Sequence, residues 1–232
     1  MTFETAIVTG AGQGFGLALT TALSSRGTTV VACARDGGRL RAATAGLPGV
    51  VAVPGDVTDP AFREALVATA RRHGGLDLLV HNAGELGPSP LPVLEHYPLD
   101  ALRGVFETTV LAPLALTQLA LPMLRASATG TVVSLSSDAA VEAYPGWGGY
   151  GAAKAALDQL TAVLAVEEPS LRVHAFDPGD MRTAMHQRAF PGEDISDRPE
   201  PATVVPALLR LLDERPPSGR HRAADLAAGS TR

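Results

Sequence analysis

The segment TGAGQGFG, residues 9–16, decides the fold that this sequence predicts. Its glycines follow directly on the apolar run TAIVT at residues 5–9, and a stretch with helical spacing begins at residue 14. An ordered glycine costs backbone entropy, so a cluster of glycines marks either a loose loop or a place where another group approaches the backbone closely. The pattern along the rest of the chain decides between these two interpretations.

Short β-rich runs alternate with stretches of helical spacing. The β-rich runs cover residues 5–9, 28–34, 50–54, 76–81, 131–136 and 171–176, and a further short strand is possible at 219–223. The helical stretches cover residues 14–25, 38–46, 60–73, 99–125, 149–168 and 201–214, whereas 85–98 and 187–201 have the composition of loops. Apolar strands separated by helices form a parallel sheet that is covered on both faces, and the crossovers are right-handed. The sequence therefore predicts an α/β fold with a doubly wound parallel sheet, the Rossmann fold.

Composition excludes several classes of function. A net charge of −5 with a pI near 5.7 is atypical of proteins that bind nucleic acid, which gather Lys and Arg on one face. Cys33 is the only cysteine and no histidines are paired at ligand spacing, so neither a disulfide framework nor a metal site is predicted. The apolar residues 105–124 include Glu107 and two prolines, which makes a poor membrane span. Because no leader pattern is visible either, we expect a soluble, cytoplasmic protein.

The position of the glycine segment between a strand and a helix indicates what it could bind. It joins the first predicted strand to the first predicted helix, where a tight turn presents backbone N–H groups and a helix dipole to a pyrophosphate. We therefore expect a nucleotide to bind at residues 9–16, with a plain strand-to-helix turn as the alternative.

Further motifs follow in order along the chain. They are Thr9-Gly10-x-x-x-Gly14-x-Gly16, Asp56-Val57, His81-Asn82-Ala83-Gly84, Ser137 thirteen residues before Tyr150, Tyr150-x-x-x-Lys154, and Pro178-Gly179-Asp180-Met181-Arg182-Thr183. In order and spacing they resemble the TGxxxGxG, DV, NNAG, Ser, YxxxK and PGxxxT motifs of the short-chain dehydrogenase/reductase family, in its single-domain form. His81 departs from the first Asn of NNAG. The resemblance covers about residues 5–185.

The resemblance implies a nicotinamide dinucleotide cofactor and a single domain over residues 1–232. This domain would have a cofactor half at about 1–100, a catalytic and substrate half at about 101–215, and a tail at 216–232. The cofactor-binding residues that it implies are Gly10, Gln13, Gly14, Phe15, Gly16, Arg35, Asp56, Val57, Asn82, Ala83, Gly84, Tyr150, Lys154, Pro178, Gly179, Met181 and Thr183.

Tyr150 and Lys154 are four residues apart on a predicted helix, so their side chains share a face. A phenol has an ordinary pKa of about 10, and a nearby ammonium favours its ionised form. A phenol tuned in this way can protonate a carbonyl oxygen while the Ser137 hydroxyl holds that oxygen. The family assigns the same roles, and there the lysine also bonds the nicotinamide ribose. Tyr and Lys at this spacing also occur on ordinary amphipathic faces, and Ser136 competes with Ser137 for the catalytic place.

The type of cofactor is indicated at the end of the second strand. NAD-dependent members of the family usually carry an acidic residue there, whereas this chain has Ala34 followed by Arg35. A guanidinium can form two charge-assisted hydrogen bonds with a 2′-phosphate. We therefore expect NADP(H), with NAD as the alternative if Arg35 instead pairs locally with Asp36.

One catalytic position departs from the family. The family has an asparagine on the helix before the serine strand, where it supports a helix distortion and a water that leads to the lysine. The residue at that place here is Thr109, which can bond back to a preceding carbonyl and bend the helix. We expect Thr109 to take the catalytic place of the asparagine.

These observations favour an NADP-dependent oxidoreductase that interconverts a small-molecule carbonyl and an alcohol. The alternatives are an NAD-dependent alcohol dehydrogenase and a cofactor-binding regulatory protein with little turnover, for which Thr109 is the main argument. Residues 105–124 and 150–166 are apolar almost all round, as in helices that pair between subunits, so we expect a homodimer or homotetramer. An apolar wall near the site is expected from Tyr144, Trp147, Met181, Met185 and Phe190.

Overall fold

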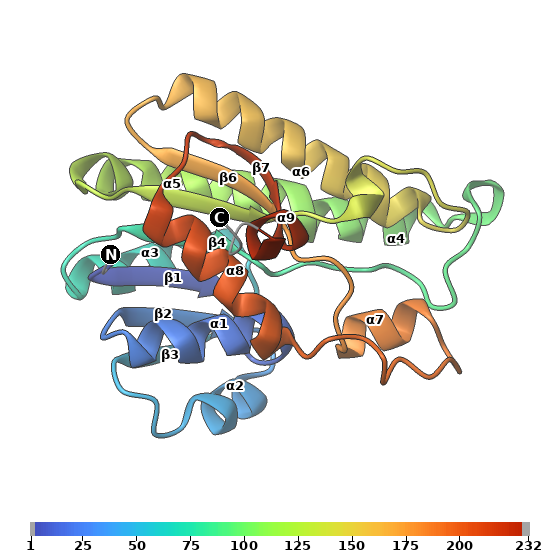
Figure 1. Ribbon diagram of the computed structural model, residues 1–232, viewed down its shortest axis with the longest axis horizontal. Coiled ribbons are helices and arrows are strands. Elements are labelled where there is room, and N and C mark those ends of the chain that lie inside the picture. Colours follow the sequence, from blue (N-terminus) through green and yellow to red (C-terminus); the bar gives the residue numbers. More distant parts are fainter. Residues whose placement is uncertain (1–2, 229–232) are drawn as a thin grey trace.

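The computed structural model describes residues 3–228, in which seven parallel strands form one sheet (Figure 1). The strands are β1 (Thr5–Thr9), β2 (Thr29–Ala34), β3 (Val50–Pro54), β4 (Leu78–His81), β5 (Thr131–Leu135), β6 (Arg172–Asp177) and β7 (Gly219–Arg222). Their order in the sheet is β3-β2-β1-β4-β5-β6-β7. This order confirms the predicted doubly wound sheet. Its direction of winding reverses between β1 and β4, the place where such sheets bind ligands.

The helices connect these strands, and local sequence fixes several of their starts. They are α1 (Gly14–Ser25), α2 (Gly37–Thr44), α3 (Pro60–Arg72), α4 (Leu99–Phe106), α5 (Ala112–Ala126), α6 (Gly148–Glu167), α7 (Ala184–Ala189), α8 (Pro201–Glu214) and α9 (Ala223–Ala228), with short 3-10 helices η1 (Leu94–His96) and η3 (Asp138–Ala140). The carboxylates of Asp36 and Asp59 accept hydrogen bonds from the N–H groups of Arg39 and Ala61. These N-caps satisfy donors that the first turns of α2 and α3 would otherwise leave open.

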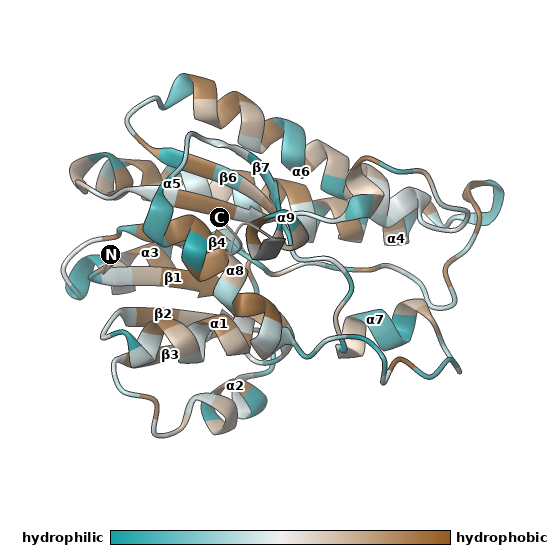
Figure 2. Ribbon diagram, viewed as in Figure 1, coloured by the Kyte–Doolittle hydropathy of each residue, from teal (hydrophilic) through white to brown (hydrophobic). Residues whose placement is uncertain are grey.

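The sheet separates two apolar layers. Ala6 and Val8 of β1 pack in the layer that contains α1 and α8, whereas Ile7 packs in the layer that contains α3 and α5. Figure 2 shows much of the inner sheet in brown, whereas the edge strand β7 is teal and α7, outside these layers, also carries teal. Because both faces are covered, β1 is buried along its whole length. The sheet is thus a firm support for the loops at its carboxyl edge.

The helix predicted at 99–125 is divided by a π-helical segment, η2 (Glu107–Leu111). The whole run Leu99–Ala126 is long and apolar enough to cross a membrane by length and composition alone, but 44% of its most apolar window is buried inside the fold. Leu116 and Leu124 of α5 belong to the core layer beside α3. The run is therefore a core helix of this fold.

Two regions carry more regular structure than their sequence pattern indicates. The expected loop at 187–201 begins inside α7, and residues 223–228 of the expected tail form α9, while the possible strand at 219–223 is confirmed as β7. Strand β7 pairs in parallel with β6, where Ala175 lies opposite Arg220. Elements this short have little periodicity of their own, and β7 forms because an open edge of β6 is available for pairing.

Candidate active site

The glycine segment packs tightly against the residues that follow β4. Gly10 and Gly14 have φ angles of +67° and +56°, in the left-handed region that favours glycine. Asn82 Nδ2 donates hydrogen bonds to the carbonyls of Thr9 and Gly10, at 2.8 and 3.1 Å. A Cβ atom at Gly16 would overlap both this amide and the Gly10 carbonyl. The turn therefore depends on glycine, and Asn82 fixes its position.

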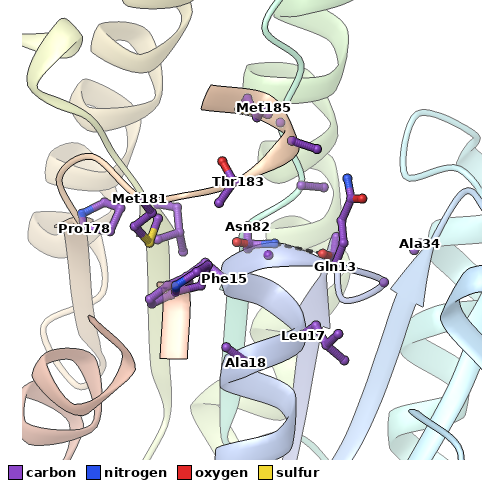
Figure 3. A pocket seen from close by; sticks show the side chains of 18 of the residues that line it. Gln13, Phe15, Leu17, Ala18, Ala34, Asn82, Pro178, Met181, Thr183 and Met185 are labelled. Atoms are coloured by element: carbon purple, nitrogen blue, oxygen red, sulfur yellow. Dashed lines mark hydrogen bonds between the residues drawn. The ribbon is translucent and has the colours of Figure 1, made fainter. Parts of the chain in front are cut away.

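A cavity of about 800 Å³ opens at the carboxyl edge of the sheet, beside this turn (Figure 3). The predicted site residues that line it are Gly10, Gln13, Gly14, Phe15, Arg35, Asp56, Val57, Asn82, Ala83, Gly84, Tyr150, Lys154, Pro178, Met181 and Thr183. Gly16, Thr109, Ser137 and Gly179 lie outside this lining. The volume is within the range of about 300–1,000 Å³ that small-molecule sites show. Since the cavity joins a glycine-rich helix start to Tyr150, the residues present fit a dinucleotide.

Two motif residues make local contacts that explain their places. The buried ring of His81 shares a hydrogen bond with the Thr117 hydroxyl at 2.8 Å, and burial lowers the pKa of His81 to about 3. His81 is therefore a neutral structural group below the loop. Asp56 Oδ1 accepts hydrogen bonds from both the N–H and the hydroxyl of Thr58, each at 2.9 Å, which holds the turn that lines the cavity.

Tyr150 and Lys154 face the cavity from α6, and both side chains are buried. Lys154 Nζ lies 5.5 Å from the centre of the Tyr150 ring. The same ammonium donates a hydrogen bond to the Leu135 carbonyl at the end of β5. The structure thus brings the two residues together on one face of the helix, next to the glycine segment.

The protonation of Tyr150 differs from the expectation. Burial raises the pKa of Tyr150 above its ordinary value, the hydrogen bond with Ser137 acts in the opposite direction, and Asp138 and Asp177 raise it further. The lowered pKa that we expected is therefore not found in this structure, where burial outweighs the other influences and the Lys154 ammonium donates to a backbone carbonyl. Tyr150 is therefore protonated at neutral pH, which is the form that can donate a proton.

Burial also disfavours the charged form of Lys154, which in this case lowers the pKa. Loss of water around the ammonium lowers the pKa of Lys154 to about 8, while the carboxylates of Asp158 and Asp177 oppose this change. The ammonium is thus still the main form at neutral pH, although much closer to losing its proton than an exposed lysine.

The two adjacent serines have different partners. Ser136 donates a hydrogen bond to Asp158 Oδ2 at 2.7 Å. Ser137 caps η3 by accepting from the Ala139 N–H at 3.2 Å, and its hydroxyl also acts on Tyr150. Of the two candidates, Ser137 is therefore the one beside the phenol, even though Ser136 lines the cavity.

Thr109 lies in the π-helical segment η2 and is fully buried. Its hydroxyl accepts a hydrogen bond from the Glu85 N–H at 3.4 Å. This bond reaches the loop after β4, whereas the sequence indicates a bond to a preceding carbonyl of the same helix. A Cβ atom at Gly84 would lie 4.0 Å from Thr109 Oγ1 and 3.8 Å from Lys154 Nζ. Thr109 and Lys154 therefore border the same point of the backbone.

Arg35 lies at the rim of the cavity with a side chain that is 64% exposed. It pairs with Glu85 at 3.2 Å, and Glu85 also pairs with Arg188 of α7 at 3.4 Å. Asp36, the alternative partner of Arg35, instead pairs with Arg39 at 3.6 Å.

Sequence patterns missed two residues of this rim. Arg39 lines the cavity and donates a hydrogen bond to the Gln13 side chain of the glycine turn. A signal for it existed, because Arg39 lies in the first turn of the helix that Asp36 begins. Glu85 directly follows the motif at residues 81–84, but no pattern indicated its pairing with two arginines.

The expected apolar wall forms in part. The Trp147 ring contacts the rings of Tyr150 and Phe190, with centres 5.7 and 5.8 Å apart, and Met185 packs in the same cluster. Tyr144 is 40% exposed and donates hydrogen bonds to two carboxylates, so it lies outside the cluster. The side of the site near Tyr150 is thus aromatic and apolar.

This combination defines a class: a doubly wound sheet in which a glycine-rich turn and a Tyr–Lys pair share one cavity. A protein-family model described as short chain dehydrogenase matches residues 4–194, and the chain belongs to this family of oxidoreductases. The L-fucose dehydrogenase of Bos taurus is 35% identical over 206 residues, which cover 86% of this chain and 72% of that protein.

Solved structures agree with this assignment. A short chain dehydrogenase from Pseudomonas syringae has a TM-score of 0.89 and 28% identity, covering 96% of this chain and 95% of the other. A short chain dehydrogenase from Escherichia coli CFT073, in complex with NADPH, has a TM-score of 0.87 and 30% identity, covering 96% of this chain and 97% of the other. NADPH is thus bound in at least one solved chain of similar structure.

Proposed function

We propose that the protein is an NADP(H)-dependent oxidoreductase that interconverts a carbonyl and an alcohol. The observation that carries this proposal is the joint placement of the glycine turn, Tyr150 and Lys154 around one cavity. Membership of the short chain dehydrogenase family and the similarity to an NADPH complex support it.

Each side chain has a definite role in the proposed reaction. The glycine turn, Asn82 and Pro178 line the cavity and would hold the dinucleotide, whose nicotinamide would supply the hydride chemistry. Tyr150, protonated at neutral pH, gives its proton to the carbonyl oxygen, and the Ser137 hydroxyl hydrogen-bonds that oxygen. Lys154 would hold the ribose of the cofactor, and its positive charge would assist the loss of the phenolic proton.

The choice of NADP(H) over NAD(H) depends on Arg35. Its exposed guanidinium at the cavity rim can reach a 2′-phosphate, and Arg39 adds a second positive charge nearby. A bound 2′-phosphate has to compete with Glu85, which is the present partner of Arg35.

A panel of aldehydes and ketones, assayed with NADPH and with NADH at pH 7, tests the function. We expect turnover with NADPH, best on substrates with an aromatic or apolar part, because Trp147 packs against Tyr150 and Phe190 packs against Trp147. Binding of NADPH without reduction of any carbonyl would favour the second candidate, a regulatory protein that retains the cofactor.

Thr109 gives a separate prediction. The valine variant Thr109→Val removes the hydroxyl at nearly constant volume and deletes the hydrogen bond to the Glu85 N–H, so kcat should fall several-fold. Thr109→Asn should keep or raise kcat because the family has asparagine there. The matched control is Thr69→Val, which removes a hydroxyl from a buried position of α3 outside the site. Equal kcat for Thr109→Val and wild type would remove Thr109 from the mechanism.

We further propose that two or four copies of the chain associate in the cytoplasm. The helical run Leu99–Ala126 and helix α6 leave large apolar side chains exposed, namely Leu99, Leu111, Leu114, Leu119, Val163 and Val166. Exposed apolar helix faces of this kind favour a subunit interface. Sedimentation should give at least twice the mass of one chain, and a monomer at micromolar concentration would contradict the proposal.

A further inference from the structure

Arg220 of β7 connects three parts of the fold behind the candidate active site. Its Nη2 donates to the Ser137 carbonyl and to Asp177 Oδ2, both at 2.9 Å, and its Nε donates to Asp158 Oδ2 at 3.1 Å. These acceptors lie just after β5, at the end of β6 and on α6. One guanidinium thus holds together the segments that carry the proposed catalytic groups.

The two carboxylates depend on this contact because little water reaches them. The Asp177 side chain is 4% exposed and that of Asp158 is 15% exposed. Asp158 Oδ1 is buried without a hydrogen-bond partner among residues 3–228, so its charge is compensated mainly through Oδ2. Carboxylates withdrawn from water need a cation nearby, since a buried charge without compensation strongly destabilises a fold.

The charges around Lys154 sum to zero only when Arg220 is counted. Asp158 lies one turn after Lys154 on the same helix, and Asp177 approaches from β6. Both carboxylates favour the charged form of Lys154. Two negative charges thus face two positive ones at this point.

The phenol of Tyr150 lies near the same carboxylates and is also close to a further one, that of Asp138. Asp177 and Asp138 both act on it, and Asp138 is held by the Ser137 and Tyr144 hydroxyls instead of by a cation. Without Arg220 the negative charge of Asp177 would therefore also act on the phenol without compensation, and would raise the pKa of Tyr150 further.

We propose that Arg220 is a positioning residue that neutralises Asp158 and Asp177 and so sets the protonation balance of the Tyr150–Lys154 pair. Its effect on catalysis rests on the proposed function. The charge balance itself can be measured without turnover, which keeps the two questions separate.

Lys154 makes this measurement direct because it is the only lysine in the sequence. In protein labelled with ¹³Cε-lysine, a single side-chain resonance reports the titration of Lys154. We expect a midpoint near 8 in the wild type and a rise of about one pH unit in Arg220→Met. The rise is expected because the positive charge of Arg220 no longer offsets the two carboxylates, which then favour the ammonium more strongly. Arg222→Met, an exposed position on the same strand, is the matched control and should leave the midpoint unchanged.

A compensating variant separates charge from shape. Arg220→Met combined with Asp158→Asn again balances one carboxylate against one ammonium, so its midpoint should return to that of the wild type. An unchanged midpoint in Arg220→Met, or a raised midpoint in the double variant, would overturn the proposal. Should Arg220→Met fail to fold, the double variant still decides: a folded protein with the wild-type midpoint supports the charge role, and an unfolded one contradicts it.

Turnover then gives the consequence for catalysis. If the carbonyl panel identifies a substrate, the limb of kcat that falls with rising pH should move upward in Arg220→Met and return in the double variant. Wild-type protein that binds NADPH without turnover would contradict the proposed function, whereas the titration of Lys154 would still test Arg220.

Discussion

Replacing Tyr150 with phenylalanine is expected to reduce turnover by about 10²–10⁴-fold, because the variant has no proton to give to the carbonyl oxygen. The ring should remain in its edge contact with Trp147, so the fold and the cavity are preserved. The affinity for NADPH, measured by fluorescence titration, should change little, since the glycine turn, Asn82 and Lys154 are untouched.

Two further variants bracket this result. Ser137→Ala removes a hydrogen bond to the carbonyl oxygen but no proton source, so its loss of rate should be smaller. Tyr144→Phe removes a phenolic oxygen from a residue outside the aromatic cluster and should lose far less turnover than Tyr150→Phe. Turnover by Tyr150→Phe as fast as that of the wild type would refute the reductase mechanism and favour the regulatory alternative.

The second large effect concerns cofactor choice. Arg35→Ala should weaken NADPH binding by about 1–3 kcal/mol, the usual cost of losing a hydrogen bond to a charged group, and should leave NADH binding nearly unchanged. Titration of both cofactors against the same variant measures this difference. An equal loss for NADPH and NADH would exclude Arg35 as the 2′-phosphate ligand.

The pairing of Arg35 with Glu85 sharpens this test. Glu85→Gln frees Arg35 from its partner and should tighten NADPH binding several-fold. Arg103→Ala removes an exposed arginine of α4 that pairs with Asp100, and it controls for overall charge. Ala34→Asp combined with Arg35→Ala should turn the preference toward NADH, because the new carboxylate repels a 2′-phosphate and accepts hydrogen bonds from ribose hydroxyls.

Local sequence was sufficient for the central part of the fold. The predicted bounds at 5–9, 14–25, 50–54 and 201–214 are those of β1, α1, β3 and α8. These segments have continuous apolar runs or strong helical spacing with clear starts and ends, so packing agrees with local preference. Because the strands are parallel, motifs that follow successive strands meet at one edge of the sheet, which is why much of the cavity lining could be named in advance.

The remaining features depend on contacts between distant parts of the chain. Glu85 and Arg35 are 50 residues apart, and Arg220 and Asp158 are 62 apart, so no spacing rule connects them. The raised pKa of Tyr150 likewise follows from burial, which a helical spacing of four residues does not reveal. Long-range electrostatics of this kind becomes visible only when the tertiary structure is known.

The position of β7 at the outer edge of the sheet has a consequence for biosynthesis. A ribosome releases the other six strands before residues 219–222, so Asp158 and Asp177 leave the exit tunnel before the arginine that pairs with both of them. During that interval the nascent chain has the two carboxylates but not the Arg220 guanidinium that pairs with them in the folded protein. A premature stop codon before residue 220 would make this condition permanent, even though every residue of the glycine turn, together with Tyr150 and Lys154, had been translated.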